Sequence, residues 1–121
     1  LFRSFDARYL LGMGTLSGKY LASKPPPRAR LSLFPHYQRY TNPQAVTATQ
    51  AYVALARAHG LSPAAMAIAF AASRPFMTSV LLGATTPEQL EETLSAATLR
   101  LDRAVLDGLE AIHTATPNPA P

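Results

Sequence analysis

The chain has 121 residues and 48% of them are hydrophobic, which fits about one globular domain and excludes a chain that is disordered throughout. It has no cysteine, so disulfides and thiolate metal sites are excluded. The net charge is +4, and because no acidic residue lies between Asp6 and Glu88, we expect an anionic partner for this basic part of the chain.

The sequence also argues against a membrane span and a metal site. No run of about 18 apolar residues is present. The three histidines are far apart and lack a paired acid motif. The first residues, LFRSFDARYL, have no long apolar core of the kind that a secretory signal carries. We therefore expect a cytoplasmic protein.

The first clear element is the loop LGMGTLSGKY, residues 11–20. Its glycines and lysine suggest a phosphate-binding loop, but neither common phosphate pattern fits. A Walker-type loop needs glycine in place of Met13 and Ser or Thr in place of Tyr20, and the dinucleotide fingerprint needs glycine in place of Ser17. Prolines then dominate residues 23–43, where we expect an extended surface segment without helix or sheet.

Two helices are predicted next. Asn42 and Pro43 form a typical helix start, and Gly60 ends that helix. Ser62 and Pro63 repeat the start signal and open AAMAIAFAAS. This second helix is apolar almost all round, so it should be buried.

The pattern changes after the second helix. The stretch MTSVLL, residues 77–82, predicts a short buried strand that ends at Gly83. Thr86 and Gln89 then form a capping box, which opens a helix to about Ala97.

Two of these loops suit a phosphate. The stretch from Leu81 to Thr93 combines a strand end, a glycine turn and a helix start, whose first turn offers unpaired N–H groups and the positive end of the helix dipole. Parallel barrels build their common phosphate site from the loops after the last two strands. If Leu10-Leu11 and residues 80–82 end such strands, both glycine loops lie at one end of a barrel.

The predicted fold class is α/β. We expect the C-terminal third of a (β/α)₈ barrel of about 250 residues or more, which is predominantly helical as an isolated chain.

The motifs LGMGTLSGKY, RLSLF, GLSPAAMAIAF and SVLLGATTPEQLEE together resemble the C-terminal part of the aldo-keto reductase family. The likeness is greatest to the bacterial branch related to potassium-channel β subunits, and it covers about residues 11–121. It implies a barrel that binds NADPH without a Rossmann fold and reduces small carbonyl substrates by hydride transfer.

The resemblance also implies cofactor-binding positions. Leu11, Gly12 and Gly14 would contact the pyrophosphate through the backbone, and Lys19 would add a charge. Arg30 matches an arginine on the 2′-phosphate side, for which Arg28 is a less well aligned substitute. The positions around the 2′-phosphate and the adenine are matched by Gly83, Thr85, Gln89, Glu92 and Thr93. The last of these is usually Asn in the family, so Thr93 departs from the pattern.

The family resemblance divides the chain into one partial domain with two unusual ends. The partial reductase domain takes in residues 1–121. Residues 1–9 match nothing expected of the family and form an atypical start. A last helix begins after Asp102, and the proline-rich tail, residues 114–121, is expected to be frayed.

The family's catalytic groups are not found in this sequence. The resemblance implies a tyrosine acid with a lysine, an aspartate and a histidine, all from the first half of the barrel. None of the five tyrosines has that setting, and nothing flanking Asp6 and Tyr9 supports them as a pair. We expect a fragment with the adenosine and pyrophosphate half of an NADP(H) site, no catalytic residues and no activity alone. The alternatives are a small basic nucleic-acid-binding module, which lacks the expected aromatic–basic pattern, and a non-functional remnant.

Overall fold

The structure is a computed structural model, and it describes residues 10–34, 36 and 38–120. In these ranges it contains helices and 3₁₀ turns and no strand. The elements in chain order are η1 (Gly12–Ser17), α1 (Arg30–Leu33), η2 (Gln38–Tyr40), α2 (Pro43–Ala58), α3 (Pro63–Ala72), α4 (Pro87–Ser95), η3 (Ala96–Thr98) and α5 (Arg103–Ala115). The expectation of a predominantly helical chain is confirmed. The atypical start, with Asp6 and Tyr9, lies outside the described residues.

The predicted helix starts are confirmed by the hydrogen bonds of their caps. Asn42, Ser62, Thr86 and Asp102 each accept a bond from the backbone N–H three residues later, at 3.0, 3.4, 3.3 and 2.8 Å respectively. Each cap therefore satisfies one of the N–H groups that a helix leaves free at its start. At the other end of α2, Gly60 adopts a φ of +67°, a left-handed conformation that suits glycine at a helix end.

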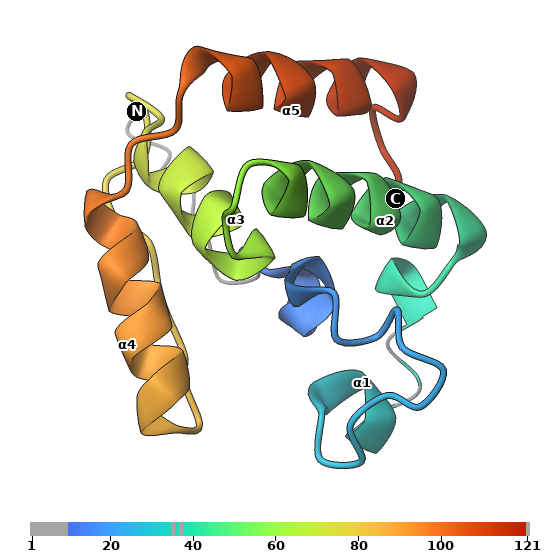
Figure 1. Ribbon diagram of the computed structural model, residues 1–121. Coiled ribbons are helices and arrows are strands. Elements are labelled where there is room, and N and C mark those ends of the chain that lie inside the picture. The colour runs from blue at the N-terminus through green and yellow to red at the C-terminus, as the bar shows by residue number, and fades with distance from the viewer. Residues whose placement is uncertain (1–9, 35, 37, 121) are drawn as a thin grey trace, which may run out of the picture.

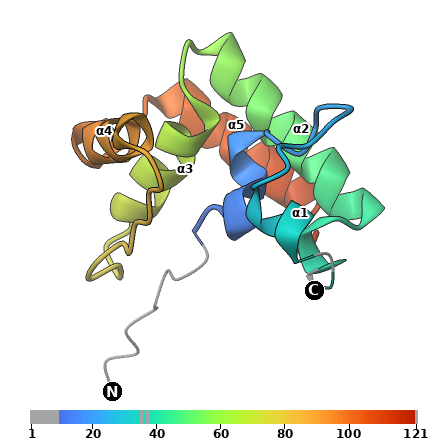
Figure 2. The same ribbon diagram turned by 90° about the horizontal axis from the view of Figure 1, so that it is seen from below.

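Helix α3 lies at the centre of the arrangement. Figure 1 shows α2 and α5 side by side on one side of it and α4 on the other, and Figure 2 agrees from below. Met66 of α3 packs with Val105 and Leu109 of α5, whereas Ile68 packs with Ala96 of η3. The prediction that this helix is buried is confirmed.

No single described helix is long and apolar enough to cross a membrane. Helices α2 and α3 pass that test, by length and composition only, when they are taken together as a pair bent by 94°.

The predicted strand at residues 77–82 is wrong for the described chain. Residues 77–82 have no regular secondary structure, and Leu81 is 55% exposed. A strand needs neighbours that pair with its N–H and C=O groups, and no strand lies among the residues that the structure describes. Leu10 and Leu11 likewise lie in a turn rather than at a strand end.

The segment 23–43 was expected to contain no helix, and this is also wrong. Helix α1 and the 3₁₀ turn η2 both lie inside it. The stretch between Pro27 and Pro35 is free of proline, so its backbone donors remain available for one helical turn. Leu31 is buried there, which gives the turn an apolar anchor.

The last two helices differ from the prediction at their ends. The helix expected to reach Ala97 ends at Ser95 and continues as η3. Its Leu94 is 58% exposed, so the apolar face of α4 is not covered by the described residues. Helix α5 ends at Ala115, inside the tail that was expected to be frayed. Beyond it, Asn42 Nδ2 donates a hydrogen bond to the backbone carbonyl of Pro119 at 2.9 Å.

We predict that stability falls at alkaline pH because of Tyr52. Burial, and secondly the Glu110 carboxylate, raise the pKa of the Tyr52 phenol above its ordinary value of 10.0. The unfolded chain then loses this proton at lower pH than the folded chain. The stability from neutral Tyr52 is therefore complete below pH 10 and is lost as pH rises through the raised pKa. Circular dichroism of the wild type should show this loss, and Tyr52→Phe should lose less helix over the same range. Equal losses in both proteins would contradict the assignment.

Candidate functional site

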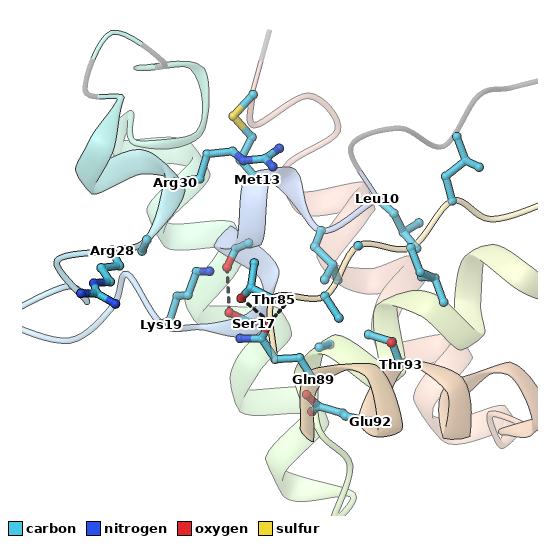
Figure 3. Close-up of a pocket in the computed structure, with 18 of the residues that line it drawn as sticks. Leu10, Met13, Ser17, Lys19, Arg28, Arg30, Thr85, Gln89, Glu92 and Thr93 are labelled. Atoms are coloured by element: carbon cyan, nitrogen blue, oxygen red, sulfur yellow. Dashed lines mark hydrogen bonds between the residues drawn. The ribbon is translucent and has the colours of Figure 1, made fainter. Parts of the chain in front are cut away.

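The two glycine loops face one cleft of about 750 Å³ (Figure 3). Its volume is within the range of about 300–1,000 Å³ that is usual for ligand pockets. The cleft is lined by every cofactor-binding position predicted from the sequence except Gly12: Leu11, Gly14, Lys19, Arg30, Gly83, Thr85, Gln89, Glu92 and Thr93. Gly12 is buried, and a Cβ there would lie 3.4 Å from the ring of Tyr40. The structure thus brings two distant parts of the chain to one place.

The glycine loop forms one wall of the cleft and is a folded turn rather than an open loop. Its residues make the 3₁₀ turn η1, in which Met13 and Gly14 have φ values of +58° and +92°. A Cβ on Gly14 would lie 2.7 Å from both Cε and Nζ of Lys19. The glycine therefore leaves the space that the lysine side chain occupies. Ser17 Oγ donates a hydrogen bond to the carbonyl of Gly14 at 2.7 Å, which holds the turn closed.

Basic side chains gather on this side of the cleft. Figure 3 shows Lys19, Arg28 and Arg30 on one side and Thr85, Gln89 and Glu92 on the other. Lys19 lies two residues after the end of η1, and Arg30 begins α1, so the positive charge comes from two separate segments. Among the described residues, no group of three or more His, Asp and Glu lies close enough to hold a metal ion. The charge of this side therefore suits an anionic ligand.

The start of α4 forms the opposite wall, and its polar groups already bind one another. Gln89 Oε1 accepts hydrogen bonds from the backbone N–H and from the hydroxyl of Thr85, both at 3.0 Å. The predicted capping box is therefore correct for Thr86, which caps the helix. In a capping box the Gln89 side chain would bind the backbone N–H of Thr86, but here it binds Thr85, which provides two donors instead of one. The pKa of the Glu88 carboxyl group is lowered. The larger cause is hydrogen bonding to its own backbone N–H, and the smaller is hydrogen bonding to the Thr86 hydroxyl.

Two further α4 side chains are fixed by neighbours. The carboxylate of Glu92 accepts a hydrogen bond from the hydroxyl of Ser62, the cap of α3. This bond joins α4 to α3 at the edge of the cleft. Thr93 is only 5% exposed, and its hydroxyl donates to the carbonyl of Leu90 at 2.9 Å. The Thr93 hydroxyl donor is therefore already used within its own helix.

Gly83 differs from the turn expected at this position. Its φ is not positive, and a Cβ there would meet no atom within 4 Å. The backbone conformation therefore does not require glycine at Gly83, although it does at Gly14.

The lining also includes large apolar residues that were not among the predicted cofactor-binding positions. They are Leu10, Met13, Leu33, Phe34, Leu81 and Leu82. Leu81 and Leu82 belong to the second phosphate loop, and the others lie within four residues of a predicted position, which is the signal that the sequence offered. They give the cleft an apolar side next to its basic one.

The sequence of this chain matches the model of the Aldo/keto reductase family over residues 5–114. The chain belongs to the aldo/keto reductase family. Protein tas of Escherichia coli (strain K12) is 48% identical over 111 residues, which cover 92% of this chain and 32% of that protein. The "Probable voltage-gated potassium channel subunit beta" of Oryza sativa subsp. japonica is 34% identical over 113 residues, or 88% of this chain and 34% of that protein. The chain spans about a third of the length of these curated relatives, and the resemblance found from its motifs is confirmed.

The two cleft glycines should respond differently to alanine. Gly14→Ala forces an L-residue into a positive φ, so it should destabilise the fold by about 1–2 kcal/mol, whereas the end of the Lys19 side chain can move away from the new Cβ. Gly83→Ala meets no atom and no strained backbone, so stability should stay within about 0.5 kcal/mol or rise slightly. Urea titration followed by circular dichroism measures both variants against the wild type. A Gly14→Ala midpoint equal to that of Gly83→Ala would refute this account of η1.

Proposed function

We propose that this chain holds the adenosine and pyrophosphate end of NADP(H), as part of an aldo-keto reductase that reduces small carbonyl compounds. The observation that carries the proposal is the cleft that Lys19 and Arg30 line together with the start of α4. The chain spans about a third of its relatives, and because its motifs resemble the C-terminal part of the family, we assign it to the C-terminal third of a (β/α)₈ barrel.

Each wall of the cleft has its own role in this proposal. The backbone of Leu11, Gly12 and Gly14 lies along the pyrophosphate, and Lys19 contributes a positive charge to it. Arg30 binds the 2′-phosphate, because a guanidinium forms strong charge-assisted hydrogen bonds with phosphate oxygens. The open space over Gly83 leaves room for close approach of the ligand.

The α4 wall binds the adenosine together with its 2′-phosphate. Thr85 and Gln89 offer a hydroxyl, a backbone N–H and an amide beside the positive end of the α4 dipole. Glu92, held by Ser62, presents a carboxylate that accepts from the adenine amino group. Thr93 completes this side, with an oxygen that can accept but a donor that α4 already uses.

The residues present fit this end of the cofactor and not its reactive end. In this family the bound nicotinamide supplies a hydride to a carbonyl carbon. The residues that line the cleft include neither a tyrosine nor a histidine that could protonate or orient that carbonyl. We therefore propose binding without chemistry for the chain by itself.

The chain alone should not reduce carbonyl compounds. NADPH oxidation with a panel of aldehydes, followed at 340 nm, should not exceed the rate in a heat-denatured control. Turnover above that control would show that the chain carries an acid–base group of its own, and the proposal of a half-site would be wrong.

Arg30→Ala should weaken NADPH binding much more than NADH binding. The two cofactors differ by the 2′-phosphate, and losing one charge-assisted contact should lower NADPH affinity roughly tenfold or more. Thr85→Val should have a smaller effect, because it removes only a neutral donor. Fluorescence titration of both cofactors against the wild type and each variant measures these changes.

The matched control is Arg57→Ala, an exposed arginine in the last turn of α2 that does not line the cleft. It should leave both affinities unchanged. Equal losses for NADPH and NADH in Arg30→Ala would show that Arg30 does not bind the 2′-phosphate.

A further inference from the structure

The basic side of the cleft depends on a contact between two segments that are separate in the sequence. Lys19 belongs to the glycine-loop segment and Arg30 to α1, and proline-rich chain connects them. Lys19 can bind the pyrophosphate and Arg30 the 2′-phosphate of one ligand only if α1 is held at a fixed position against η1. The side chain that makes this link is Tyr20.

The Tyr20 hydroxyl bonds to both segments. It accepts a hydrogen bond from the backbone N–H of Leu31 at 3.1 Å, and it donates one to the carbonyl of Met13 at 3.4 Å. The Lys19 ammonium lies 5.3 Å from the centre of the same ring, within the range of a cation–π interaction. One phenol therefore contacts the loop, the lysine and the helix that carries Arg30.

The first of these bonds satisfies an N–H group at the start of α1, and the second holds a residue of η1 with a left-handed backbone. Helix α1 has only four residues, and its cap residue, Ala29, has no side chain that could accept from the first turn. The Tyr20 hydroxyl accepts from that turn instead, from a position 11 residues away. Met13 has a left-handed φ of +58°, which a non-glycine residue keeps only where its surroundings hold it. The hydrogen bond from the Tyr20 hydroxyl to the Met13 carbonyl is part of these surroundings.

We propose that Tyr20 is a positioning residue that sets the preference of the cleft for a 2′-phosphorylated adenosine. It does not line the cleft. It acts by fixing α1 against η1, so that Arg30 reaches the 2′-phosphate while Lys19 reaches the pyrophosphate of the same ligand. This inference rests on the proposed NADP(H) function and adds to it a residue that determines specificity.

Tyr20→Phe tests the inference, because it keeps the ring over Lys19 and removes the two hydrogen bonds. The ligands are adenosine 2′,5′-bisphosphate and adenosine 5′-monophosphate, titrated separately by calorimetry. The wild type should prefer the bisphosphate, and Tyr20→Phe should reduce that preference roughly three- to tenfold. In an Arg30→Ala background, Tyr20→Phe should reduce it no further, because Tyr20 acts through Arg30. Tyr52→Phe, the same chemical change in the core and away from the cleft, should leave the preference unchanged.

Amide hydrogen exchange measured by NMR gives a readout that does not depend on the ligand. The Leu31 amide should exchange faster in Tyr20→Phe than in the wild type, with no change in Tyr52→Phe. If the wild type does not distinguish the two ligands, both the NADP(H) proposal and the role of Tyr20 are overturned. If the wild type prefers the bisphosphate and Tyr20→Phe keeps that preference, or weakens both ligands equally, only the role of Tyr20 is overturned.

Discussion

The packing of α3 is the constraint on which the rest of the structure depends. This helix is apolar on all sides, so it must be covered on all sides. On one side Met66 packs against α5, and on the other Ile68 packs against η3, together with Leu10 and Leu11 at the start of the glycine loop. The two walls of the cleft are thus attached to the same helix.

The cap of α3 extends this attachment to α4. Ser62 accepts from the first turn of its own helix and donates to Glu92 of α4. A single serine therefore begins the central helix and orients a side chain of the cleft. This explains why loops that are distant in the sequence face each other: each is fixed to α3, and neither needs to contact the other directly.

The polar groups of Thr85 and Gln89 on the α4 wall bind each other. Gln89 Oε1 accepts from both donors of Thr85. A phosphate at this wall must replace these bonds rather than fill empty donors. Because such an exchange leaves the number of hydrogen bonds almost unchanged, the net gain is small. The affinity of this chain should then depend chiefly on the cations of the opposite wall.

Local chemistry explains what the sequence predicted well. Asn42, Ser62, Thr86 and Asp102 were recognised as caps because a cap bonds to a residue only three positions away. The positions of the cleft residues came from the resemblance to a family, and the structure places them together with the exception of Gly12.

Features that depend on distant partners were predicted poorly or not at all. The strand at 77–82 was wrong because a strand forms only beside other strands, and the described chain contains none. The left-handed Met13 and the bonds of Tyr20 had no sequence signal, since no periodicity or motif reports a bond between a loop and a helix 11 residues later.

The central claim is that two separate loops of this chain form one binding site for the adenosine end of NADP(H). The most direct test is an NMR titration of the ¹⁵N-labelled chain with adenosine 2′,5′-bisphosphate. The account predicts shifts of backbone amides on both walls, at Gly14 and Lys19 as well as at Thr85 and Gln89, with one common dissociation constant. Shifts confined to one wall, shifts centred on the α2–α5 side, or no shifts at millimolar ligand would contradict it.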